Sequence, residues 1–352
     1  MHHARRGRLT GMPAQRATLM QVAQRAGVSR STASFVLTGR HVDMRISEDT
    51  RQRVLRAAQE LDYRPNLMAR SLRTKTTRTI ALVSDTIASD PYAGRAIHGA
   101  LAAAVAHGHL LFIGETEGDP VVEEKLIADF LDRQVDAFVY ASMFTRYVRV
   151  PKVLRDRRVV LLNCLTRGSR AVHPAVIPDE VAAGRAAAQL VVESDHRAGI
   201  YLLGDTAELV FAGRERTAGI REGLGAAGIR LAGTIGCNWW PDSAFEAVSA
   251  ALADGVRPRV LLCLNDRIAL GAYQAVREAG FTVPGDVSVV SFDDSELAAW
   301  LRPPLTSIGL PHYQLGWQAV ELLLAPPAEP SVVRVPMPVR HRGSVVKPSE
   351  LT

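Results

Sequence analysis

The sequence predicts an α/β protein, with a small all-α domain at the N-terminus and a larger domain built on parallel sheets. Residues 17–63 carry apolar side chains at helical spacing. After residue 78, short apolar runs rich in β-branched residues alternate with stretches rich in alanine and leucine. Strands that alternate with helices imply parallel sheets covered by helices, and wholly apolar strands fit burial on both faces.

Two short helices with a turn between them are predicted at the start of the all-α domain. Apolar residues recur at helical spacing over residues 19–26, and Thr18 is a candidate N-cap. Gly27 ends this helix, because glycine adopts the left-handed cap conformation at little cost. Ser29 is a candidate cap for a second helix over residues 29–37. The pattern indicates a helix-turn-helix, although many helical hairpins share its spacing.

A third helix and a short helical segment follow. Ser47 is the candidate cap of the third helix, and Val54 and Leu61 belong to its apolar face. Pro65 ends that helix and can begin the next one. Residues 66–72 form a helical segment too short to be stable in water by itself, so we expect it to order only when something holds it.

Positive charge is concentrated in the N-terminal part of the chain. Residues 1–78 contain 16 Lys and Arg against 5 Asp and Glu, a net charge of +11. Residues 79–352 contain 26 against 31, a net charge of −5. A basic head on a mildly acidic body is the electrostatic footprint of a DNA-binding module. The alternative is a basic tail that binds any polyanion, and the apolar periodicity of the head argues against it.

Two strings carry a specific resemblance, VAQRAGVSRSTASFVLTG and RISEDTRQRVLRAAQELDYRPNLMARSLRT. They closely resemble the DNA-binding headpiece and hinge of the lactose-repressor (LacI/GalR) family of bacterial transcription regulators. The resemblance implies a homodimer on a near-palindromic DNA operator, with the second helix in the major groove. It also implies paired hinge helices that press a leucine into the central minor groove and kink the DNA.

By position in the resemblance, most DNA contacts fall on the second helix. Arg30, Ser31 and Phe35 stand where the base readers of the family stand. Thr32 and Ser34 look like phosphate contacts. Phe35 replaces an arginine that is common at its position, so a guanine contact is lost or is moved to Arg30. The Phe35 ring could instead touch a thymine methyl group.

The resemblance also assigns a minor-groove wedge to the hinge. Leu72 is the expected wedge, supported by Ala69. The alternative for Leu72 is an ordinary apolar residue that packs its own helix. Residues 39–45 form a loop longer than in the lactose repressor, after which the family is named. Its basic side chains either reach phosphate or only solvate the loop.

Changes in composition place the domain boundaries. We expect a disordered basic tail over residues 1–16, a headpiece over residues 17–63 and a hinge with its linker over residues 64–78. An effector-binding and dimerisation domain is expected over residues 79–344, and a C-terminal tail over residues 345–352. The alternation in the large domain is too long for one compact sheet. We therefore expect two lobes, with a crossover near 176–179 and return crossings near 293–306 and 325–332. This resembles the type I periplasmic-binding-protein fold, which the family uses as its effector domain.

The predicted strands and helices of the large domain follow from its apolar runs. The strands are expected over residues 79–85, 110–114, 137–141, 159–164, 199–204, 260–264 and 287–292. Helices are expected between most of them, over residues 94–107, 123–134, 180–192 and 266–279. Ligands in sheets of this kind bind at the carboxyl ends of the strands.

Polar and aromatic residues that follow the predicted strands form a candidate effector site. By family position its members are Asp85, Tyr92, Asp179, Arg216, Trp239, Asn265 and Asp293. A polyol needs such a set, because carboxylates accept hydrogen bonds from adjacent hydroxyls, arginine donates in a fork, and an aromatic face covers a sugar ring. A carbohydrate is therefore the expected effector, and a nucleoside is the alternative.

Several of these residues also have ordinary structural interpretations. Asp179 could cap the helix that follows it, and Trp239 could be a core residue, with Trp240 as the ligand contact instead. Asp266 is left out of the site, because it is expected only to cap the helix that it begins.

An enzyme is not expected. The sequence has no GxGxxG after the first strand, no Walker loop and no GxSxG motif, and its histidines lack the spacing of metal ligands. Cys164, Cys237 and Cys263 lie in apolar runs and are expected to be reduced core residues. No cofactor or metal is therefore predicted.

The alternatives to a regulator are a solute-binding protein and an architectural DNA-binding protein. The start of the chain lacks the apolar core of a secretion signal, and no stretch is apolar for long enough to span a membrane. We therefore expect a cytoplasmic protein. An architectural protein would not need the candidate effector residues. The C-terminal tail has no leucine heptads, so we expect a homodimer and not a tetramer.

Overall fold

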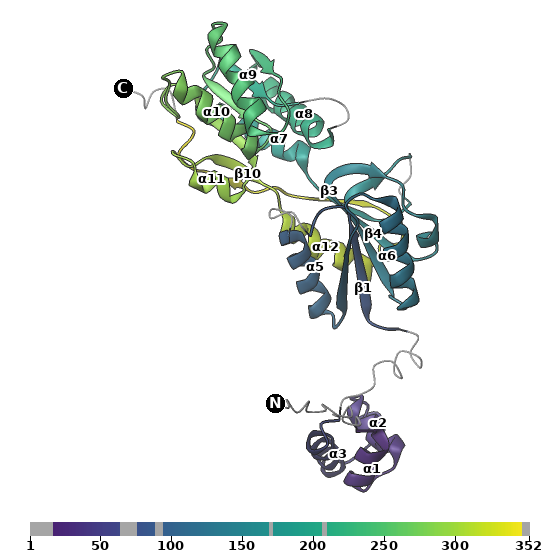
Figure 1. Cartoon of the computed structure of the whole chain (residues 1–352). Coiled ribbons are helices and arrows are strands. Elements are labelled where there is room, and N and C mark those ends of the chain that lie inside the picture. The colour runs from purple at the N-terminus through teal and green to yellow at the C-terminus, as the bar shows by residue number, and fades with distance from the viewer. Residues whose placement is uncertain (1–16, 64–75, 89–93, 169–171, 206–209, 347–352) are drawn as a thin grey trace, which may run out of the picture. The chain divides into compact units, whose positions relative to one another are not determined.

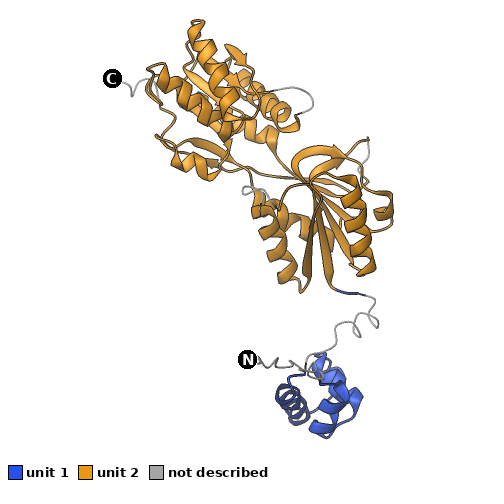
Figure 2. Ribbon diagram, in the orientation of Figure 1, with its two compact units in different colours: residues 1–77 blue, residues 78–352 orange. Residues whose placement is uncertain are grey.

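The computed structural model describes residues 17–63, 76–88, 94–168, 172–205 and 210–346. The chain divides into two compact units, residues 1–77 and 78–352 (Figure 2). The predicted basic tail, nearly all of the predicted hinge and three of the predicted contact residues lie outside the described residues. Those three residues are Ala69, Leu72 and Tyr92.

The first unit contains three helices. They are α1, α2 and α3, over Leu19–Ala26, Arg30–Leu37 and Glu48–Glu60 (Figure 1). The three predicted N-caps are confirmed, because the side chains of Thr18, Ser29 and Ser47 each accept a hydrogen bond from a backbone N–H of the first turn. Gly27 ends α1 at φ 67°, in the left-handed conformation predicted for it.

Small apolar side chains form the core of the first unit. Val22, Ala33 and Val54 are wholly buried, one from each helix. Arg25 of α1 pairs with Glu60 of α3 at 2.7 Å. Because these short helices are unstable singly, their packing determines the orientation of α2.

The second unit contains two parallel sheets, each of six strands among the residues described (Figure 1). The sheet of lobe 1 has the order β11-β5-β4-β3-β1-β2. Its strands in chain order are Thr79–Ser84, Leu110–Glu115, Ala137–Val148, Arg158–Thr166, Ala175–Pro178 and Val332–Val335. The sheet of lobe 2 has the order β12-β10-β9-β8-β6-β7, and only β12 is antiparallel to its neighbour. Its strands, β6 to β10 and β12, are Ile200–Leu203, Gly233–Ile235, Val260–Cys263, Ser288–Asp293, Thr306–Gly309 and Val339–Arg340.

Helices cover both faces of each sheet. Lobe 1 has α5, α6, a short 3-10 helix and α12, over Gly94–Ala106, Pro120–Asp132, Lys152–Leu154 and His312–Leu324. Lobe 2 has α7 to α11, over Glu180–Glu193, Phe211–Ala226, Pro241–Ala253, Asp266–Glu278 and Glu296–Trp300. Alternate residues of β1 enter different cores: Leu82 packs with α5 and α12, and Val83 packs with α6. No helix in the described part of the chain is long and apolar enough to cross a membrane.

Glycine allows one pair of helices in each lobe to pack closely. A Cβ on Gly316 of α12 would meet the Ala96 carbonyl of α5, and a Cβ on Gly219 of α8 would meet the Val181 carbonyl of α7. α12 lies beside α5 in lobe 1, although the two helices are far apart in the sequence (Figure 1).

The return crossings differ from those predicted. β9 and β10 are parallel neighbours in lobe 2, so residues 293–306 do not leave that lobe. The chain returns to lobe 1 between β10 and α12, and crosses again between β11 and β12, so the predictions near 293–306 and 325–332 are wrong. The strand β10 begins with two buried polar residues, Thr306 and Ser307, so its sequence resembles that of a loop. The Thr306 amide donates to Ser344 Oγ, and the Ser307 hydroxyl donates to Asp266 Oδ1, each at 2.8 Å.

Candidate functional site

The outer face of α2 presents the residues predicted to contact DNA. Ala33 and Val36 are buried, which turns the opposite side of the helix outward. Arg30 and Ser31 are exposed, whereas Thr32, Ser34 and Phe35 are half-buried, as the burial pattern of α2 shows. The amide of Thr32 donates to Ser29 Oγ at 3.0 Å, which fixes the first turn.

An arginine from the long loop lies over the unusual phenylalanine of α2. The Arg40 guanidinium is 5.6 Å from the centre of the Phe35 ring. Arg40 also lies 3.9 Å from the Asp43 carboxylate of the same loop. Phe35 and the loop of residues 39–45 are therefore in contact, and the loop places a cation over the Phe35 ring.

In lobe 2, Arg216 is enclosed by protein groups. Its side chain is 2% exposed. Nε and Nη2 donate to the two carboxylate oxygens of Glu180 at 2.7 and 3.1 Å, and Nη1 donates to the Leu264 carbonyl. The guanidinium lies 4.7 Å from the Phe292 ring centre and 5.9 Å from that of Trp239. Burial opposes the charge of Arg216, but Glu180 and other carboxylates raise its pKa above the ordinary value.

Asp293 lies beside Arg216 at the end of β9. Its Oδ1 is 3.5 Å from Arg216 Nη1. Its φ of 104° is strained for a residue with a side chain, and such strain is concentrated at functional sites. Burial raises the pKa of Asp293 to about 7; Arg216 opposes this, whereas Asp266 and Glu180 reinforce it.

The adjacent residues Asn265 and Asp266 lie at the start of α10 and make different contacts. Asn265 is the N-cap of α10, because its Oδ1 accepts from the Ile268 amide at 2.7 Å. Asp266 does not cap the helix, and that prediction is wrong. Its carboxylate instead accepts from the amide and hydroxyl of Ser295 and from the Ser307 hydroxyl, each at 2.8 Å. Asp266 therefore ties the start of α10 to the segment after β9 and to β10.

Of the adjacent residues Trp239 and Trp240, Trp239 is the one whose ring lies beside the Arg216 guanidinium. Trp239 is half-buried, and its Nε1 has no hydrogen-bond partner among the described residues. The Asn265 amide donates to the Trp239 carbonyl at 3.4 Å. Trp240 is 57% exposed, and its ring lies under the Arg267 guanidinium at 4.8 Å.

Asp179 acts as a helix cap. Its carboxylate accepts from the Ala182 amide at 3.2 Å at the start of α7. Its own amide donates to the Val335 carbonyl at 2.9 Å. These contacts agree with the structural alternative for Asp179, and they place the residue where β5 of lobe 1 leads into α7 of lobe 2.

In lobe 1, Asp85 follows β1 and is held by several donors. Its Oδ2 accepts from Ser142 Oγ at 2.7 Å and from Arg146 Nη2 at 3.0 Å. Its Oδ1 accepts from the amides of Thr86 and Met143, both at 2.8 Å. These contacts connect the carboxyl end of β1 to β3.

A polar cavity of about 140 Å³ opens beside Asp85. Its polar lining residues are Ser84, Asp85, Thr116, Glu123, Tyr140 and Arg146. The Tyr140 hydroxyl donates to Glu123 Oε2 at 2.6 Å. The Ser84 hydroxyl is buried without a partner among the described residues. We call this cavity the lobe 1 pocket.

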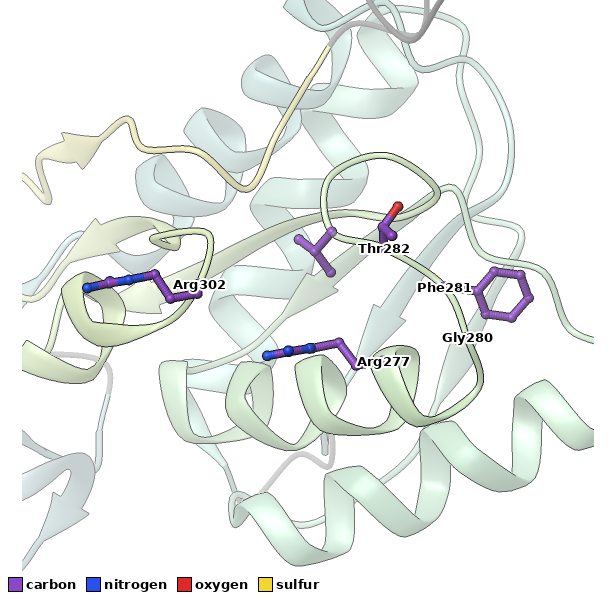
Figure 3. Close-up of a pocket in the computed structure, with 6 residues that line it drawn as sticks. Arg277, Gly280, Phe281, Thr282 and Arg302 are labelled. Carbon is purple, nitrogen blue, oxygen red and sulfur yellow. The ribbon is translucent and has the colours of Figure 1, made fainter.

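A wider cavity of about 370 Å³ lies in lobe 2 between the end of α10 and the start of β9. Figure 3 shows Arg277, Thr282 and Arg302 around it. This is the amino end of β9. Because ligands of parallel sheets bind at the carboxyl ends of strands, the wider cavity is not the candidate effector site.

Comparisons with known proteins agree with both units. The family described as "Bacterial regulatory proteins, lacI family" matches residues 18–66, and the periplasmic binding protein-like domain matches residues 182–345. The HTH-type transcriptional regulator AscG of Escherichia coli is 31% identical over 299 residues, which cover 84% of this chain and 87% of AscG. This chain belongs to the LacI family. As a LacI-family protein, it is a DNA-binding transcription regulator.

Other relatives of this LacI-family regulator include repressors. The ribose operon repressor of Haemophilus influenzae is 29% identical over 321 residues, covering 88% of this chain and 91% of the relative. The lac repressor dimer, solved with operator and the anti-inducer ONPF, has a TM-score of 0.72 at 24% identity and covers 94% of this chain and 100% of that chain. A complex of the regulator CelR with cellobiose has a TM-score of 0.63 at 27% identity, with the same coverage. None of these relatives is named as an enzyme.

Sequence reasoning missed several polar residues around the candidate effector positions of this LacI-family regulator. Glu180 gave no signal, because a glutamate in the first turn of a helix is an ordinary partner of the helix dipole. Ser84 lies inside an apolar strand, and Glu123 lies on a helix surface, so neither follows the end of a strand. The packing of α6 against the sheet brings Glu123 to Tyr140 of β3.

Proposed function

We propose that this LacI-family regulator represses transcription by binding a near-palindromic operator as a homodimer, and that a small effector sets its affinity for the operator. The observation that carries the proposal is the outward polar face of α2 in a chain that is 31% identical to AscG over 84% of its length. The proposed location of the protein is the cytoplasm, where a bacterial regulator binds chromosomal DNA.

The proposed DNA contacts are those of α2 and the hinge. Arg30, Ser31 and Phe35 read bases, and Thr32 and Ser34 hold phosphates. Arg40, stacked on Phe35 at 5.6 Å, adds positive charge next to the thymine methyl contact proposed for that ring. The proposed minor-groove wedge is Leu72, supported by Ala69.

We propose that the effector binds at the carboxyl ends of the strands of both lobes. Relatives solved with cellobiose and with ribose support a carbohydrate. The proposed contact residues are Asp85, Tyr92, Asp179, Arg216, Trp239, Asn265 and Asp293. Within this set, Arg216 positions Asp293 and Trp239, because its own donors are directed at protein acceptors. Asp85 and Asp179 are held in place by donors of the protein, Ser142 Oγ and the Ala182 amide.

The proposal is tested by fluorescence anisotropy of the full chain on DNA from its own upstream region, at two salt concentrations. We expect tight, salt-dependent and sequence-selective binding that one sugar of a panel changes about tenfold. Arg30→Ala is expected to weaken operator binding by about 1–3 kcal/mol. Arg25→Ala, on α1 and paired with Glu60, is the matched control. Binding that ignores both DNA sequence and every sugar would refute the proposal.

A further inference from the structure

The end of α2 determines where the loop of residues 39–45 begins. Gly39 follows the helix at φ 76°, and its amide donates to the Val36 carbonyl at 3.1 Å. The amide of the next residue, Arg40, donates to the Phe35 carbonyl at 2.9 Å. These two hydrogen bonds form a Schellman motif, in which the residue after the left-handed glycine returns to the third-last residue of the helix. The motif therefore brings the Arg40 side chain beside the Phe35 ring.

Backbone hydrogen bonds also hold the rest of the loop. The Met44 amide donates to the Arg40 carbonyl at 3.2 Å, and the Ile46 amide donates to the His41 carbonyl at 2.9 Å. Arg40 is thus bonded through both its amide and its carbonyl. Because its backbone is already ordered, less conformational entropy is lost when its side chain binds a partner.

The Arg40 side chain keeps most of its donors available. Its guanidinium carbon lies 5.6 Å from the centre of the Phe35 ring, and its Nε lies 3.9 Å from the Asp43 carboxylate. The side chain is 56% exposed, and in the described part of the chain Nη1 and Nη2 have no hydrogen-bond partner. The contact with the ring uses no hydrogen bond. A fork of N–H donors is therefore open to a ligand beside Phe35.

Asp43 argues against a phosphate as that ligand. Its carboxylate is 70% exposed and lies close to the Arg40 guanidinium. A phosphate bound by Arg40 would also approach this carboxylate, and the repulsion between like charges opposes such binding. The edge of a base pair, in contrast, carries no net charge.

A donor fork next to a carboxylate matches one kind of base pair. In the major groove, guanine presents the acceptors O6 and N7, which an arginine fork can bind together. The paired cytosine presents its N4 amino group, which a carboxylate can accept from. An A·T pair offers no pair of acceptors to the fork. Arg40 and Asp43 together are therefore complementary to a G·C pair.

We propose that Arg40 reads a guanine in the major groove, with Asp43 accepting from the paired cytosine, next to the base pair contacted by Phe35. This inference rests on the proposed function, in which α2 binds operator DNA. It goes further by assigning a base contact to the loop of residues 39–45 and by naming the base. Phe35 and Arg40 then read two neighbouring base pairs, the first through a thymine methyl group and the second through a guanine.

The experiment uses the full chain and a library of DNA duplexes with a randomised segment, from which bound sequences are selected. Fluorescence anisotropy then measures Kd for a selected duplex and for duplexes in which single base pairs are replaced. We expect each half-site to contain one G·C pair whose replacement weakens binding by the wild type at least about fivefold. Arg40→Ala should weaken binding to the selected duplex by a similar factor and should lose the preference at that pair alone.

Arg45→Ala is the matched control for charge. Arg45 is another exposed arginine of the same loop, so this variant loses the same positive charge. We expect it to keep the preference of the wild type for the G·C pair. The midpoint of urea unfolding of each variant shows that the headpiece remains folded.

Two further variants test how Arg40 is positioned. Phe35→Leu removes the ring that contacts the guanidinium, so the preference for the G·C pair should weaken, and Arg40→Ala should cost less in Phe35→Leu than in the wild type. Asp43→Asn removes a negative charge. It should strengthen binding to unselected DNA and lower the preference for the G·C pair.

Two outcomes would overturn the assignment of Arg40 alone. If Arg40→Ala weakens every duplex by the same factor and lowers the slope of log Kd against log salt by about one, Arg40 contacts a phosphate. If Arg40→Ala changes neither affinity nor preference, Arg40 only closes the end of α2. In both cases the wild type still selects a sequence, so the regulator function stands. A wild type that selects no sequence would contradict the proposed function, and this inference with it.

Discussion

Lobe 1 and lobe 2 each carry an arginine–carboxylate pair at the carboxyl edge of a parallel sheet, but the two pairs differ in burial. Arg216 and Glu180 are each 2% exposed. Arg146 is 53% exposed, and its partner Asp85 is 15% exposed. The same chemistry is therefore part of the core in lobe 2 and part of the surface in lobe 1. The energy of an ion pair depends on this difference far more than on its distance.

The largest expected effect comes from breaking the buried pair. Glu180→Gln leaves the Arg216 charge buried without its bidentate partner, and we expect the free energy of unfolding to fall by about 3–5 kcal/mol. The matched lobe 1 change, Arg146→Ala, should cost no more than about 1 kcal/mol. Urea unfolding of both variants measures the contrast. Glu222→Gln, which breaks an exposed pair with Arg185, is the control and should resemble Arg146→Ala.

A second, smaller effect tests the close packing of the helix pair in each lobe, α7 with α8 and α5 with α12. Gly219→Ala places a methyl group against the Val181 carbonyl, and we expect a loss of about 1–3 kcal/mol in the free energy of unfolding. Gly316→Ala should do the same in lobe 1. Gly225→Ala, on the same helix as Gly219 with open space around it, should be neutral or stabilising by about 0.5–1 kcal/mol. Thermal unfolding distinguishes these signs, and equal losses in all three variants would contradict the close packing.

The smallest expected effect depends on pH and belongs to lobe 2. Burial raises the pKa of Asp293 to about 7, so the folded state binds a proton more tightly than the unfolded chain does. The contribution of Asp293 to stability should therefore be greatest at low pH and should be lost as pH rises from about 4 to about 7, by on the order of 1 kcal/mol for a partly exposed group. Asp293→Asn should remove this dependence. Urea unfolding of both proteins between pH 5 and pH 8 provides the measurement, and parallel curves would refute the assignment.

The helix starts and the strands could be predicted because they depend on residues that are close together in the sequence. Thr18, Ser29 and Ser47 are side chains that cap helices by bonding within three residues. The strands of both sheets are short apolar runs because parallel strands are buried on both faces. Asp293 ends β9, as a polar residue at the carboxyl end of a predicted strand should, and it meets Arg216 of α8 there.

What could not be predicted depends on partners that are distant in the sequence. Whether Arg216 is open to a ligand is decided by Glu180, which is 36 residues away along the chain. β10 was missed because its two buried hydroxyls bond to residues dozens of positions away in the sequence: that of Thr306 to the backbone of Arg342, and that of Ser307 to Asp266. No pattern in the sequence shows which polar side chains will be buried, or which protein groups will replace their hydrogen bonds to water.

The three passages of the chain between the lobes have a consequence for synthesis on the ribosome. Lobe 1 contains α12 and β11, and lobe 2 contains β12, so lobe 1 is complete only after residue 335 has been made and lobe 2 only after residue 340. The headpiece has only local contacts and can fold as soon as it emerges. A nascent chain of this regulator therefore carries a folded DNA-binding headpiece long before either lobe of the second unit is complete.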